Sequence, residues 1–425
     1  MSSKQQNIED IYPLSPAQQG MLMVLLLGGY RSEVYFEQVV ATLEGPLDAA
    51  AWESAWREVV RRHPALRTQF VWEKREQPLQ VVRRDAELPW TALDWSGLPE
   101  AEREDRLAAF LEDDHAQGFD LGKPPLMRIA MVRWAEDVHK LVWSFHHLVL
   151  DGWSISLVLS EAMELYAAGR QGRAPQLQPP RPYRGYVSWL QRQDPARAEA
   201  FWRRALDGFA TPTPLPFDGT GTETSEPSGW ASTQERRELD PRATEGLEAL
   251  ARGNGLTLNT LVQGAWGMLL ARLAAGAAGA GSADIVFGAV VSGRPTEVEG
   301  IDGMAGLFIN ALPVRVRTDS GRELVAWLRD LQSAQTEQRE FEHCLLEQVQ
   351  AWSEVPRHTP LFESLLVFQN YPVDPLGLGD ATGFRMTDSR LKESTHDPLT
   401  CYVTPEDGRL QLRLAYHWKR FGAAA

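Results

Sequence analysis

The stretch from residue 138 to residue 168 constrains the fold most, because it predicts a buried strand that passes directly into a helix. The apolar run Val138–Phe145 is typical of a buried strand, and Ser154–Ala168 carries apolar side chains at spacings of three and four. Between them lies the segment His146-His147-Leu148-Val149-Leu150-Asp151-Gly152. A strand-to-helix connection of this kind favours a fold of mixed sheet and helix layers.

Further helix and strand patterns alternate along the chain. Ser15, followed by Pro16 and then Gln18, forms a capping-box pattern that predicts the start of a helix. Apolar periodicity predicts helices at 16–27, 48–62, 257–273 and 323–340. Strands are predicted at 285–291, 308–316 and 365–369, and a hairpin at 399–418 that turns at Asp407-Gly408. Both halves of the chain are therefore predicted to be mixed α/β layers.

The length predicts two domains. A chain of 425 residues with 43% apolar content can bury a sizeable core, and it is longer than one ordinary domain. The proline-rich stretch 178–182 is stiff and poor in helix formers, as connections between domains often are. We therefore expect an N-terminal domain at 1–177, which carries the two histidines, and a C-terminal domain at 178–425.

Charge and cysteine content exclude several classes of function. The chain has 57 acidic residues against 43 Lys and Arg, a net charge of −14, so its surface repels nucleic acid. Cys344 and Cys401 are too few for a disulfide framework or a structural zinc site, and we expect no metal. The apolar stretch Met21–Leu27 is too short to span a bilayer, and no basic signal-peptide start precedes it. We expect a cytoplasmic protein that binds neither nucleic acid nor membrane.

The double histidine is the candidate for chemistry. A histidine such as His147 can act as an acid, a base or a hydrogen-bonding group near neutral pH. Asp151 could orient that ring, as a carboxylate does in a catalytic triad, or could pair with an arginine and lock the loop. Gly152 would give the backbone freedom for the turn into the helix. From this segment alone, both histidines could equally be buried structural residues.

No motif for a nucleophile or a cofactor accompanies the histidines. The sequence contains no Gly-x-Ser-x-Gly elbow, no Walker-type loop, no Rossmann glycine fingerprint and no His-Glu-x-x-His zinc motif. A histidine without these partners suits the attack of one substrate on another that is already activated. Acyl transfer from a thioester to an amine fits that description.

Five segments along the chain form a recognisable series: Leu14–Leu22, Arg62–Thr68, His146–Gly152, Tyr183–Trp189 and Gly306–Pro313. In this order they resemble the signature motifs of the condensation domains of nonribosomal peptide synthetases. The third segment matches the family's His-His-x-x-x-Asp-Gly core at every fixed position. Segments similar to the sixth and seventh family motifs, at 340–344 and around 389–390, are weak. The order and spacing of the five favour a working role for His147 over a buried structural one.

The resemblance implies two chloramphenicol-acetyltransferase-like lobes in a V, with a tunnel between them and His147 near its middle. Donor and acceptor peptidyl carrier proteins would dock at opposite mouths and deliver their substrates on phosphopantetheine arms, so no cofactor would be bound permanently. The acceptor amine would attack the donor acyl or peptidyl thioester and form an amide. The expected neighbour is an adenylation domain of the same assembly line.

The resemblance also implies roles for the residues of the core motif. His147 would position the acceptor amine or accept its proton, and His146 would be structural. Asp151 would form a salt bridge with an arginine of the second motif, and we favour Arg67 as that arginine.

The other arginine of the second motif and three further residues have simpler interpretations. Arg62 lies four residues after Glu58 on the same predicted helix, where an ordinary surface ion pair accounts for it. Trp153 is interpreted as a packing residue. Ser292 and Asn310 are candidates for lining the tunnel, with structural roles favoured. The resemblance further implies a floor loop at about 286–306 and a latch at about 370–397.

Other members of the same superfamily are alternatives. An epimerisation domain shares the fold and the double histidine, but the segments 153–156 and 368–372 are typical of condensing members. A non-catalytic recruiting platform usually has a degraded core motif, and this motif is intact. A plant-type coenzyme A acyltransferase would carry an Asp-Phe-Gly-Trp-Gly motif, which is absent. The segments 8–15 and 35–38 suggest a D-configured donor and leave an L-configured one open.

Overall fold

The computed structural model describes residues 7–27, 35–215, 232–278, 284–318, 321–370, 382–393 and 397–417. The chain divides into two compact units, each discontinuous in sequence. The first unit contains Met1–Arg192, Arg294–Phe308 and Tyr371–Thr395, and the second contains Gln193–Gly293, Ile309–Asn370 and His396–Ala425. The predicted boundary after residue 177 does not coincide with this division, because residues 178–192 belong to the first unit.

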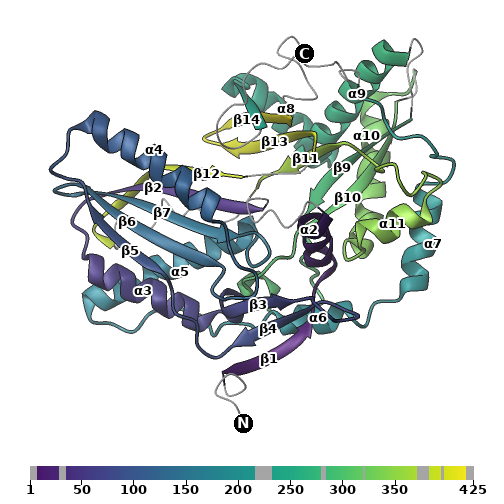
Figure 1. The fold of residues 1–425 in the computed structure, drawn as a ribbon. Helices are drawn as coiled ribbons and strands as arrows, with labels where there is room; N and C mark the ends of the chain where they lie inside the picture. The colour runs from purple at the N-terminus through teal and green to yellow at the C-terminus, as the bar shows by residue number, and fades with distance from the viewer. Residues whose placement is uncertain are drawn as a thin grey trace. The chain divides into compact units, whose positions relative to one another are not determined.

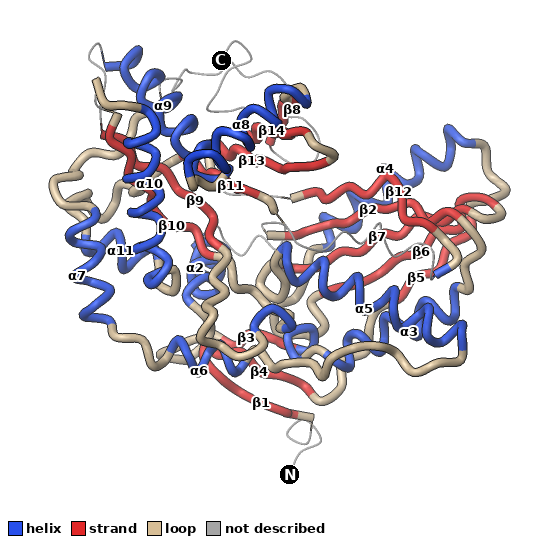
Figure 2. The backbone as a smooth tube through the Cα atoms, turned by 180° about the vertical axis from the view of Figure 1, so that it is seen from behind, coloured by secondary structure: helices blue, strands red, loops and turns tan. Residues whose placement is uncertain are grey.

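The first unit contains a five-stranded sheet with the order β12-β2-β7-β6-β5. Its strands are β2 (Phe36–Glu44), β5 (Trp90–Asp94), β6 (Met127–Ala135), β7 (Val138–His146) and β12 (Arg385–Lys392). The helices α3 (Ala49–Arg62) and α5 (Gly152–Gln171) cover one face, and α4 (Glu100–Gln117) covers the other (Figure 1 and Figure 2). The predicted strand at 138–145 is therefore the central strand β7, and the predicted helix at 154–168 lies within α5.

Side chains alternate between the two faces along β7, and both faces are covered. Val142 belongs to a core cluster with Val132 of β6 and Leu107 of α4. The next residue, Trp143, faces the other way and lies against Trp56 of α3, with ring centroids 4.8 Å apart. Because both faces are buried, the strand has the nearly continuous apolar sequence from which it was predicted.

A smaller antiparallel sheet in the first unit has the order β1-β4-β3. It consists of β1 (Ile8–Pro13), β3 (Thr68–Val71) and β4 (Leu79–Arg83). The helix α2 (Pro16–Leu27) follows β1 in sequence and η1 (Pro64–Arg67) precedes β3, whereas α6 (Arg184–Leu190) is distant in sequence and contacts β1. Tyr12 of β1 and Val82 of β4 share a core cluster with Tyr183 and Tyr186. The same cluster contains Val298, Ile301, Met304 and Phe308. This shared core explains why the segments 178–192 and 294–308 belong to the first unit.

The second unit contains a six-stranded sheet with the order β10-β9-β11-β13-β14-β8. Its strands are β8 (Ser232–Glu238), β9 (Asp284–Val291), β10 (Asn310–Arg317), β11 (Ser364–Phe368), β13 (Leu399–Glu406) and β14 (Arg409–His417). The helices are α7 (Pro195–Ala205), α8 (Pro241–Asn254), α9 (Leu258–Ala278), α10 (Leu324–Gln338) and α11 (Leu346–Trp352). Phe287 of β9 packs in one core with Trp266 of α9, whereas Val286 packs in another with Trp202 of α7. This sheet is thus also covered on both faces.

Two local predictions are confirmed in detail. The backbone N–H of Ser15 donates to Oε1 of Gln18 at 2.9 Å, and the N–H of Gln18 donates to Oγ of Ser15 at 3.3 Å, which completes the capping box. Between β13 and β14, Asp407 and Gly408 have φ values of 48° and 70°, as a two-residue primed turn requires. Trp418, at the end of the predicted hairpin, lies outside the described residues.

Two other segments differ from the prediction or are described in part. The predicted strand 308–316 begins two residues later, at Asn310, because the N–H of Phe308 donates to Asp151. Of the predicted latch at 370–397, residues 371–381 and 394–396 lie outside the described part of the chain. The strand β12 within it pairs antiparallel with β2 and thus joins the sheet of the first unit.

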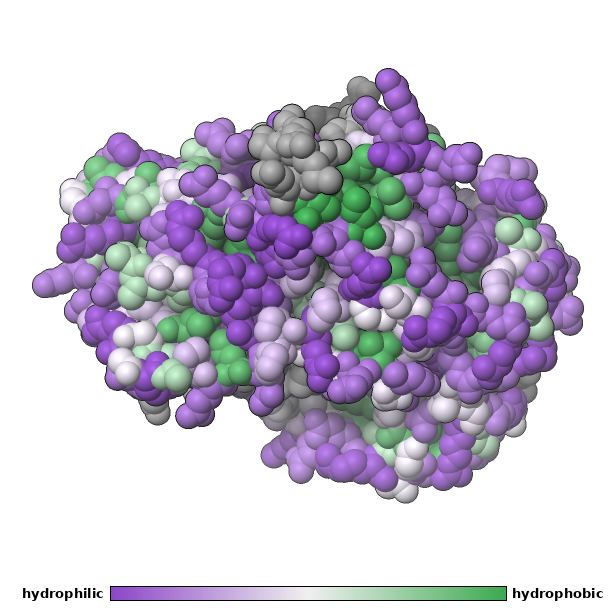
Figure 3. Space-filling view, turned by 90° about the horizontal axis from the view of Figure 1, so that it is seen from below, coloured by the Kyte–Doolittle hydropathy of each residue, from purple (hydrophilic) through white to green (hydrophobic). Residues whose placement is uncertain are grey.

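The surface is consistent with the composition. On the face that Figure 3 shows, hydrophilic residues predominate and hydrophobic ones lie in patches between them. In the described part of the chain, no helix is long and apolar enough to cross a membrane.

Candidate active site

The two histidines lie where β7 ends and the loop to α5 begins. His146 is the last residue of β7 and pairs with Phe36 of β2. The N–H of His147 donates to the carbonyl oxygen of Tyr35 at 2.9 Å. At the other end of the loop, Oδ1 of Asp151 accepts from the N–H of Ser154 at 2.8 Å and caps α5. Both ends of the short loop are therefore anchored.

The ring of His147 is held in one tautomer. Its Nδ1 lies 2.7 Å from the carbonyl oxygen of Leu150. A carbonyl oxygen accepts hydrogen bonds and cannot donate them, so Nδ1 carries the proton. In the neutral ring, Nε2 then has a free lone pair. Because His147 is partly exposed, it presents Nε2 as an acceptor for a hydrogen bond or a proton.

His146 differs from its neighbour in burial and in charge. It is fully buried, and its Nδ1 accepts from the N–H of Leu148 at 3.1 Å. Burial and the adjacent His147 lower the pKa of His146 from 6.5 to about 3, so the ring is neutral at physiological pH. These contacts fit the structural role expected of His146.

Asp151 locks the loop and does not orient the His147 ring. Its carboxylate accepts from the N–H of Ser154 and from the N–H of Phe308 at 3.1 Å, and it faces the guanidinium of Arg294. The N–H of Asp151 donates to the carbonyl oxygen of Gly306 at 3.1 Å. Because a backbone carbonyl holds His147, the triad-like interpretation of Asp151 is wrong, and the loop-locking interpretation agrees with the structure.

The arginine that pairs with Asp151 is Arg294, which the sequence analysis missed. Its Nη2 lies 3.2 Å from Oδ1 and 3.4 Å from Oδ2 of Asp151, and 3.0 Å from Oγ of Ser154. Its Nη1 donates to the carbonyl oxygens of Ile301 and Met304, and its guanidinium stacks on the ring of Phe308, 3.9 Å from the centroid. Arg294 lies in the expected floor loop, but no local pattern links it to a residue 143 positions earlier.

Arg67 was predicted to pair with Asp151, and this prediction is wrong. Its side chain is buried, and its donors go to the carbonyl oxygens of Val60, Arg83 and Arg84 and to the carboxylate of Glu9. Arg67 therefore joins the end of α3 to the small sheet. The guanidinium of Arg67, the last residue of η1, therefore already has hydrogen-bond partners and does not need Asp151.

Arg62 was predicted to pair with Glu58, and this prediction is also wrong. Glu58 pairs with Arg61, whereas Arg62 donates to Glu161 of α5 at 2.8 Å and to the carbonyl oxygen of Gln178. The buried His63 lies 2.9 Å from the same carboxylate of Glu161. Burial raises the pKa of Glu161, but the hydrogen bonds from His63 and Arg62 outweigh this effect and lower it overall.

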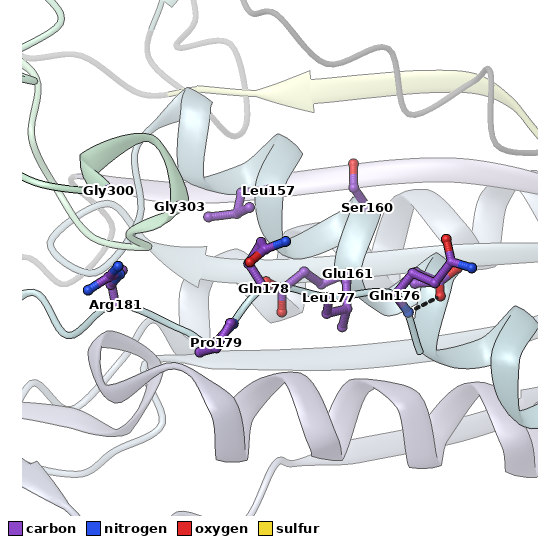
Figure 4. Close-up of a pocket in the computed structure, with 11 residues that line it drawn as sticks. Leu157, Ser160, Glu161, Gln176, Leu177, Gln178, Pro179, Arg181, Gly300 and Gly303 are labelled. Atoms are coloured by element: carbon purple, nitrogen blue, oxygen red, sulfur yellow. Dashed lines mark hydrogen bonds between the residues drawn. The ribbon is translucent and has the colours of Figure 1, made fainter. Parts of the chain in front are cut away.

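Glu161 also lines a pocket of about 650 Å³ in the first unit. Figure 4 shows Leu157, Ser160 and Glu161 of α5 together with residues 176–179, Arg181, Gly300 and Gly303. The residues that line this pocket do not include those of the 146–152 loop. It is therefore distinct from the candidate active site.

Gly152 and Trp153 begin α5. Gly152 does not have a positive φ, so the turn into the helix does not use the freedom that we expected of this glycine. The indole N–H of Trp153 donates to the carbonyl oxygen of Asp302 at 2.9 Å, and its ring lies 5.3 Å from the Arg294 guanidinium. These contacts agree with the packing role expected of Trp153.

Ser292 and Asn310 belong to the second unit. Ser292 is exposed. The amide of Asn310 donates to the carbonyl oxygens of Glu342 and Cys344 at 2.9 and 2.6 Å, so it tethers the segment that follows η3 (Arg339–Phe341). The contacts of Asn310 agree with the structural role that we favoured.

Residues of several predicted motifs meet around the loop. Nε2 of Gln18, in the first motif, donates to the carbonyl oxygen of Leu148 at 3.0 Å. The hydroxyl of Tyr183, in the fourth, donates to the carbonyl oxygen of Leu307 in the fifth. A Cβ on Gly306 would lie 2.3 Å from Cδ2 of Tyr183, so this position must be glycine. The sequence motifs thus supply the structural support of one loop.

This arrangement can perform acid–base or hydrogen-bonding chemistry at a single imidazole. The other side chains between His147 and Asp151 are aliphatic, so the loop supplies no nucleophile. Among the described residues, no group of three or more His, Cys, Asp or Glu is arranged to hold a metal ion. A substrate that carries its own activated group suits such a site.

Comparison with known proteins identifies the relatives of this chain. Residues 8–425 match the family described as the condensation domain. A linear gramicidin synthase protein of Brevibacillus parabrevis is 40% identical over 99% of this chain and 5% of its own length. Chondramide synthase cmdD of Chondromyces crocatus is 41% identical over 88% of this chain and 9% of its own length. Bacitracin synthase 1 of Bacillus licheniformis is 32% identical, over 96% and 8%. The chain thus spans less than a tenth of each of these relatives.

Solved structures agree on the fold. The starter condensation domain of rhizomide synthetase RzmA superposes with a TM-score of 0.76 at 19% identity, over 98% of this chain and 92% of that one. The first condensation domain of the calcium-dependent antibiotic synthetase, in complex with a substrate analogue, superposes with a TM-score of 0.74 at 20% identity, over 98% of this chain and 93% of that one. These likenesses confirm the predicted mixed α/β fold of the chloramphenicol-acetyltransferase-like type.

Proposed function

Since the chain belongs to the condensation-domain family of nonribosomal peptide synthetases, we propose that it forms an amide bond between two carrier-tethered substrates. The acceptor aminoacyl amine attacks the carbonyl carbon of the donor acyl or peptidyl thioester. A C–N bond forms, the C–S bond breaks, and the donor thiol leaves with the proton that the amine gives up. The thioester supplies the activation, so the protein has to orient the amine and manage its proton.

His147 is the residue that we assign to this task. The observation that carries the assignment is the contact of its Nδ1 with the carbonyl oxygen of Leu150. This contact leaves Nε2 without a proton, and an unprotonated nitrogen can accept a hydrogen bond from the amine or take its proton in the transition state. In either role, a positively charged His147 would be inactive.

The partners follow from the same assignment. The relatives are synthases many times longer than this chain, which supports a place within an assembly line. We propose that donor and acceptor peptidyl carrier proteins bring the substrates on phosphopantetheine arms. These arms belong to the carriers, so the chain needs no cofactor of its own, and an adenylation domain is the proposed neighbour.

The test loads one carrier protein with a donor aminoacyl group and a second with an acceptor, and adds this chain. We expect a dipeptidyl thioester on the acceptor carrier, detected by mass spectrometry. His147→Ala should lower kcat by ~10²- to 10⁴-fold, the range for loss of a general acid or base. The control is His358→Ala, which removes an exposed histidine of the second unit and should leave the rate unchanged.

Two results would overturn the proposal. The assignment of His147 fails when a folded His147→Ala variant makes the dipeptide at the wild-type rate. The condensation activity fails when the wild type makes no dipeptide but exchanges the α hydrogen of the loaded donor with deuterium from the solvent. The second result would identify an epimerising member of the superfamily.

A further inference from the structure

Gln18 connects the start of α2 to the loop that carries His147. Its side chain is 2% exposed, and its amide makes four hydrogen bonds. Oε1 accepts from the N–H of Ser15 at 2.9 Å and from Nε2 of Gln80 at 2.9 Å. Nε2 donates to the carbonyl oxygen of Leu148 at 3.0 Å and to Oε1 of Gln80 at 3.4 Å. Every donor and acceptor position of the amide is therefore used.

The partners fix which way the amide points. The N–H of Ser15 can only donate, and the carbonyl oxygen of Leu148 can only accept, so Oε1 and Nε2 of Gln18 cannot exchange places. Gln80 is 1% exposed, and its Nε2 also donates to the carbonyl oxygen of Pro13 at 3.0 Å. The two glutamines form a rigid buried pair between α2, the small sheet and the loop.

The carbonyl group that Gln18 holds lies one residue after His147. The N–H of Val149, in the same peptide plane, donates to the carbonyl oxygen of His146 at 3.1 Å, so this plane is held from both sides. Release of the Leu148 carbonyl would allow the short loop to shift, and a shift of the loop would move the Leu150 carbonyl. That carbonyl fixes the tautomer and the direction of the His147 ring. An anchor on Leu148 therefore also limits the movement of the ring.

We propose that Gln18, braced by Gln80, is a positioning residue for His147: by holding the Leu148 carbonyl it keeps Nδ1 of His147 on the Leu150 carbonyl and Nε2 free. Gln18 does not touch the reacting atoms and acts through the loop backbone. This inference rests on the proposed role of His147. It gives the first-motif glutamine a task in the reaction beyond its part in the capping box.

Glutamate at position 18 separates the two tasks of the glutamine. A glutamate side chain completes a capping box as well as a glutamine does, so the start of α2 is kept. As a carboxylate, however, it faces two oxygens, those of Leu148 and of Gln80, and has no proton to donate. Burial raises the pKa of such a carboxyl group, and its protonated form regains a donor for Leu148. The defect of Gln18→Glu should therefore disappear as the pH falls.

The titratable groups around Gln18 do not obscure this pH dependence. Tyr183 hydrogen-bonds to Ser15, and burial raises its pKa well above the ordinary value. His146, which accepts from Leu148, has a pKa of about 3 because it is buried. Both stay neutral between about pH 6 and about pH 8.5. The wild type and the variant share every other group near the loop, so the ratio of their rates reports the introduced carboxyl group.

The experiment measures dipeptide formation with saturating loaded carriers between about pH 6 and about pH 8.5, for wild type, Gln18→Glu and Gln19→Glu. Gln19 is the matched control, because its Nε2 donates to the carbonyl oxygen of Leu14 at 3.1 Å and not to the loop. At the alkaline end, kcat of Gln18→Glu should fall on the order of 100-fold, the effect of a small misplacement of a catalytic group. The rate ratio should return towards one as the pH falls, and Gln19→Glu should follow the wild type throughout.

A second readout does not depend on activity. In protein labelled with ¹⁵N-histidine, NMR of His147, assigned with His147→Ala, should show protonated Nδ1 and unprotonated Nε2 in the wild type at about pH 8.5. In Gln18→Glu at the same pH, the two nitrogen shifts should move towards each other as the tautomers mix. Thermal unfolding is measured for each variant at each pH, so that rates and spectra are compared only where the protein is folded.

The outcomes separate this inference from the proposed function. If the wild type makes no dipeptide, the proposed function fails, and the NMR comparison still tests the link between Gln18 and the ring. If the wild type is active, the inference is overturned by a Gln18→Glu variant with wild-type rates and an unchanged His147 tautomer at about pH 8.5. A Gln18→Glu rate that is low by the same factor at every pH overturns it as well.

Discussion

Nη2 of Arg294 lies 3.2 Å from Oδ1 of Asp151, and the two side chains are 4% and 0% exposed. This buried pair holds the segment Arg294–Phe308 against the start of α5, at the end of the loop that carries His147. Removal of one partner would leave the other charge buried without compensation, which is far more costly than the net energy of the pair.

Arg294→Ala is therefore expected to lower the free energy of unfolding by ~3 to 5 kcal/mol, as measured by urea denaturation. The control is Arg61→Ala, because Arg61 is 72% exposed and pairs with Glu58 on the surface. That change should cost less than about 1 kcal/mol. Similar losses in the two variants would contradict the importance that we give to the buried pair.

Arg67 should not be coupled to Asp151, although its own loss should be costly. Arg67→Ala removes a buried side chain that bonds three carbonyl groups and Glu9. In double-mutant cycles with Asp151→Asn, Arg294→Ala should show a coupling of ~0.5 to 3 kcal/mol, and Arg67→Ala should be additive within about 0.5 kcal/mol. A larger coupling for Arg67 than for Arg294 would restore the pairing predicted from the sequence.

Gly306→Ala should disturb the loop that carries His147, because Gly306 contacts both Tyr183 and Asp151. A Cβ at this position would lie 2.3 Å from Cδ2 of Tyr183, so either the ring or the backbone around Gly306 must move. The carbonyl of Gly306 accepts from Asp151, so a shift would reach the histidine loop. We expect a loss of ~1 to 3 kcal/mol in unfolding free energy and a lower condensation rate. Gly303→Ala is the control, because no atom lies within 4 Å of its added Cβ, and it should leave both quantities unchanged.

His146 should make the folded state sensitive to acid. Its pKa is about 3 in the folded state because of burial, against 6.5 for an ordinary histidine, so the unfolded chain takes up a proton first. Its contribution to stability is complete above pH 6.5 and is lost as the pH falls from 6.5 towards 3. Between about pH 7 and pH 5 the loss is ~2 kcal/mol. His146→Asn stays neutral and should lose less stability over this interval; equal losses in the two proteins would argue against the prediction.

Glu342 should have the opposite dependence. Burial raises its pKa from 4.5 to about 7, and the N–H of Gly293 and the charge of Arg339 reduce that effect. A raised carboxyl pKa favours folding at low pH, and this contribution is lost as the pH rises from 4.5 to 7. Glu342→Gln can still accept from Gly293 and should be more stable than the wild type at about pH 8, by on the order of 2 to 3 kcal/mol. Its gain should shrink at about pH 5.

The control for that comparison is Glu340→Gln. Glu340 is 57% exposed and pairs with Arg197 on the surface, so the change should alter the unfolding free energy by less than about 1 kcal/mol at either pH. A gain at the higher pH as large as that of Glu342→Gln would show that loss of any negative charge has this effect.

The sequence alone determined the features that depend on residues close together in the chain. The capping box of Ser15 and Gln18, the primed turn at Asp407-Gly408 and the apolar run of β7 each depend on interactions over a few positions. Such patterns set the local backbone whatever lies further away. The histidine motif was likewise visible as a contiguous segment, and with it the family and the residue assigned to the reaction.

Only the tertiary structure decided which distant groups complete the site. Arg67 and Arg294 are both buried. Arg67 pairs with Glu9 and backbone carbonyl groups, whereas Arg294 pairs with Asp151, and the residues adjacent to each arginine do not reveal these partners. Likewise, the tautomer of His147 depends on where the loop places the Leu150 carbonyl, and the loop is held by a glutamine 130 positions from Leu148. A buried charge or amide takes the partners that the folded backbone brings to it, because an unpaired one is costly in the interior. That choice is made in three dimensions and leaves no local pattern in the sequence.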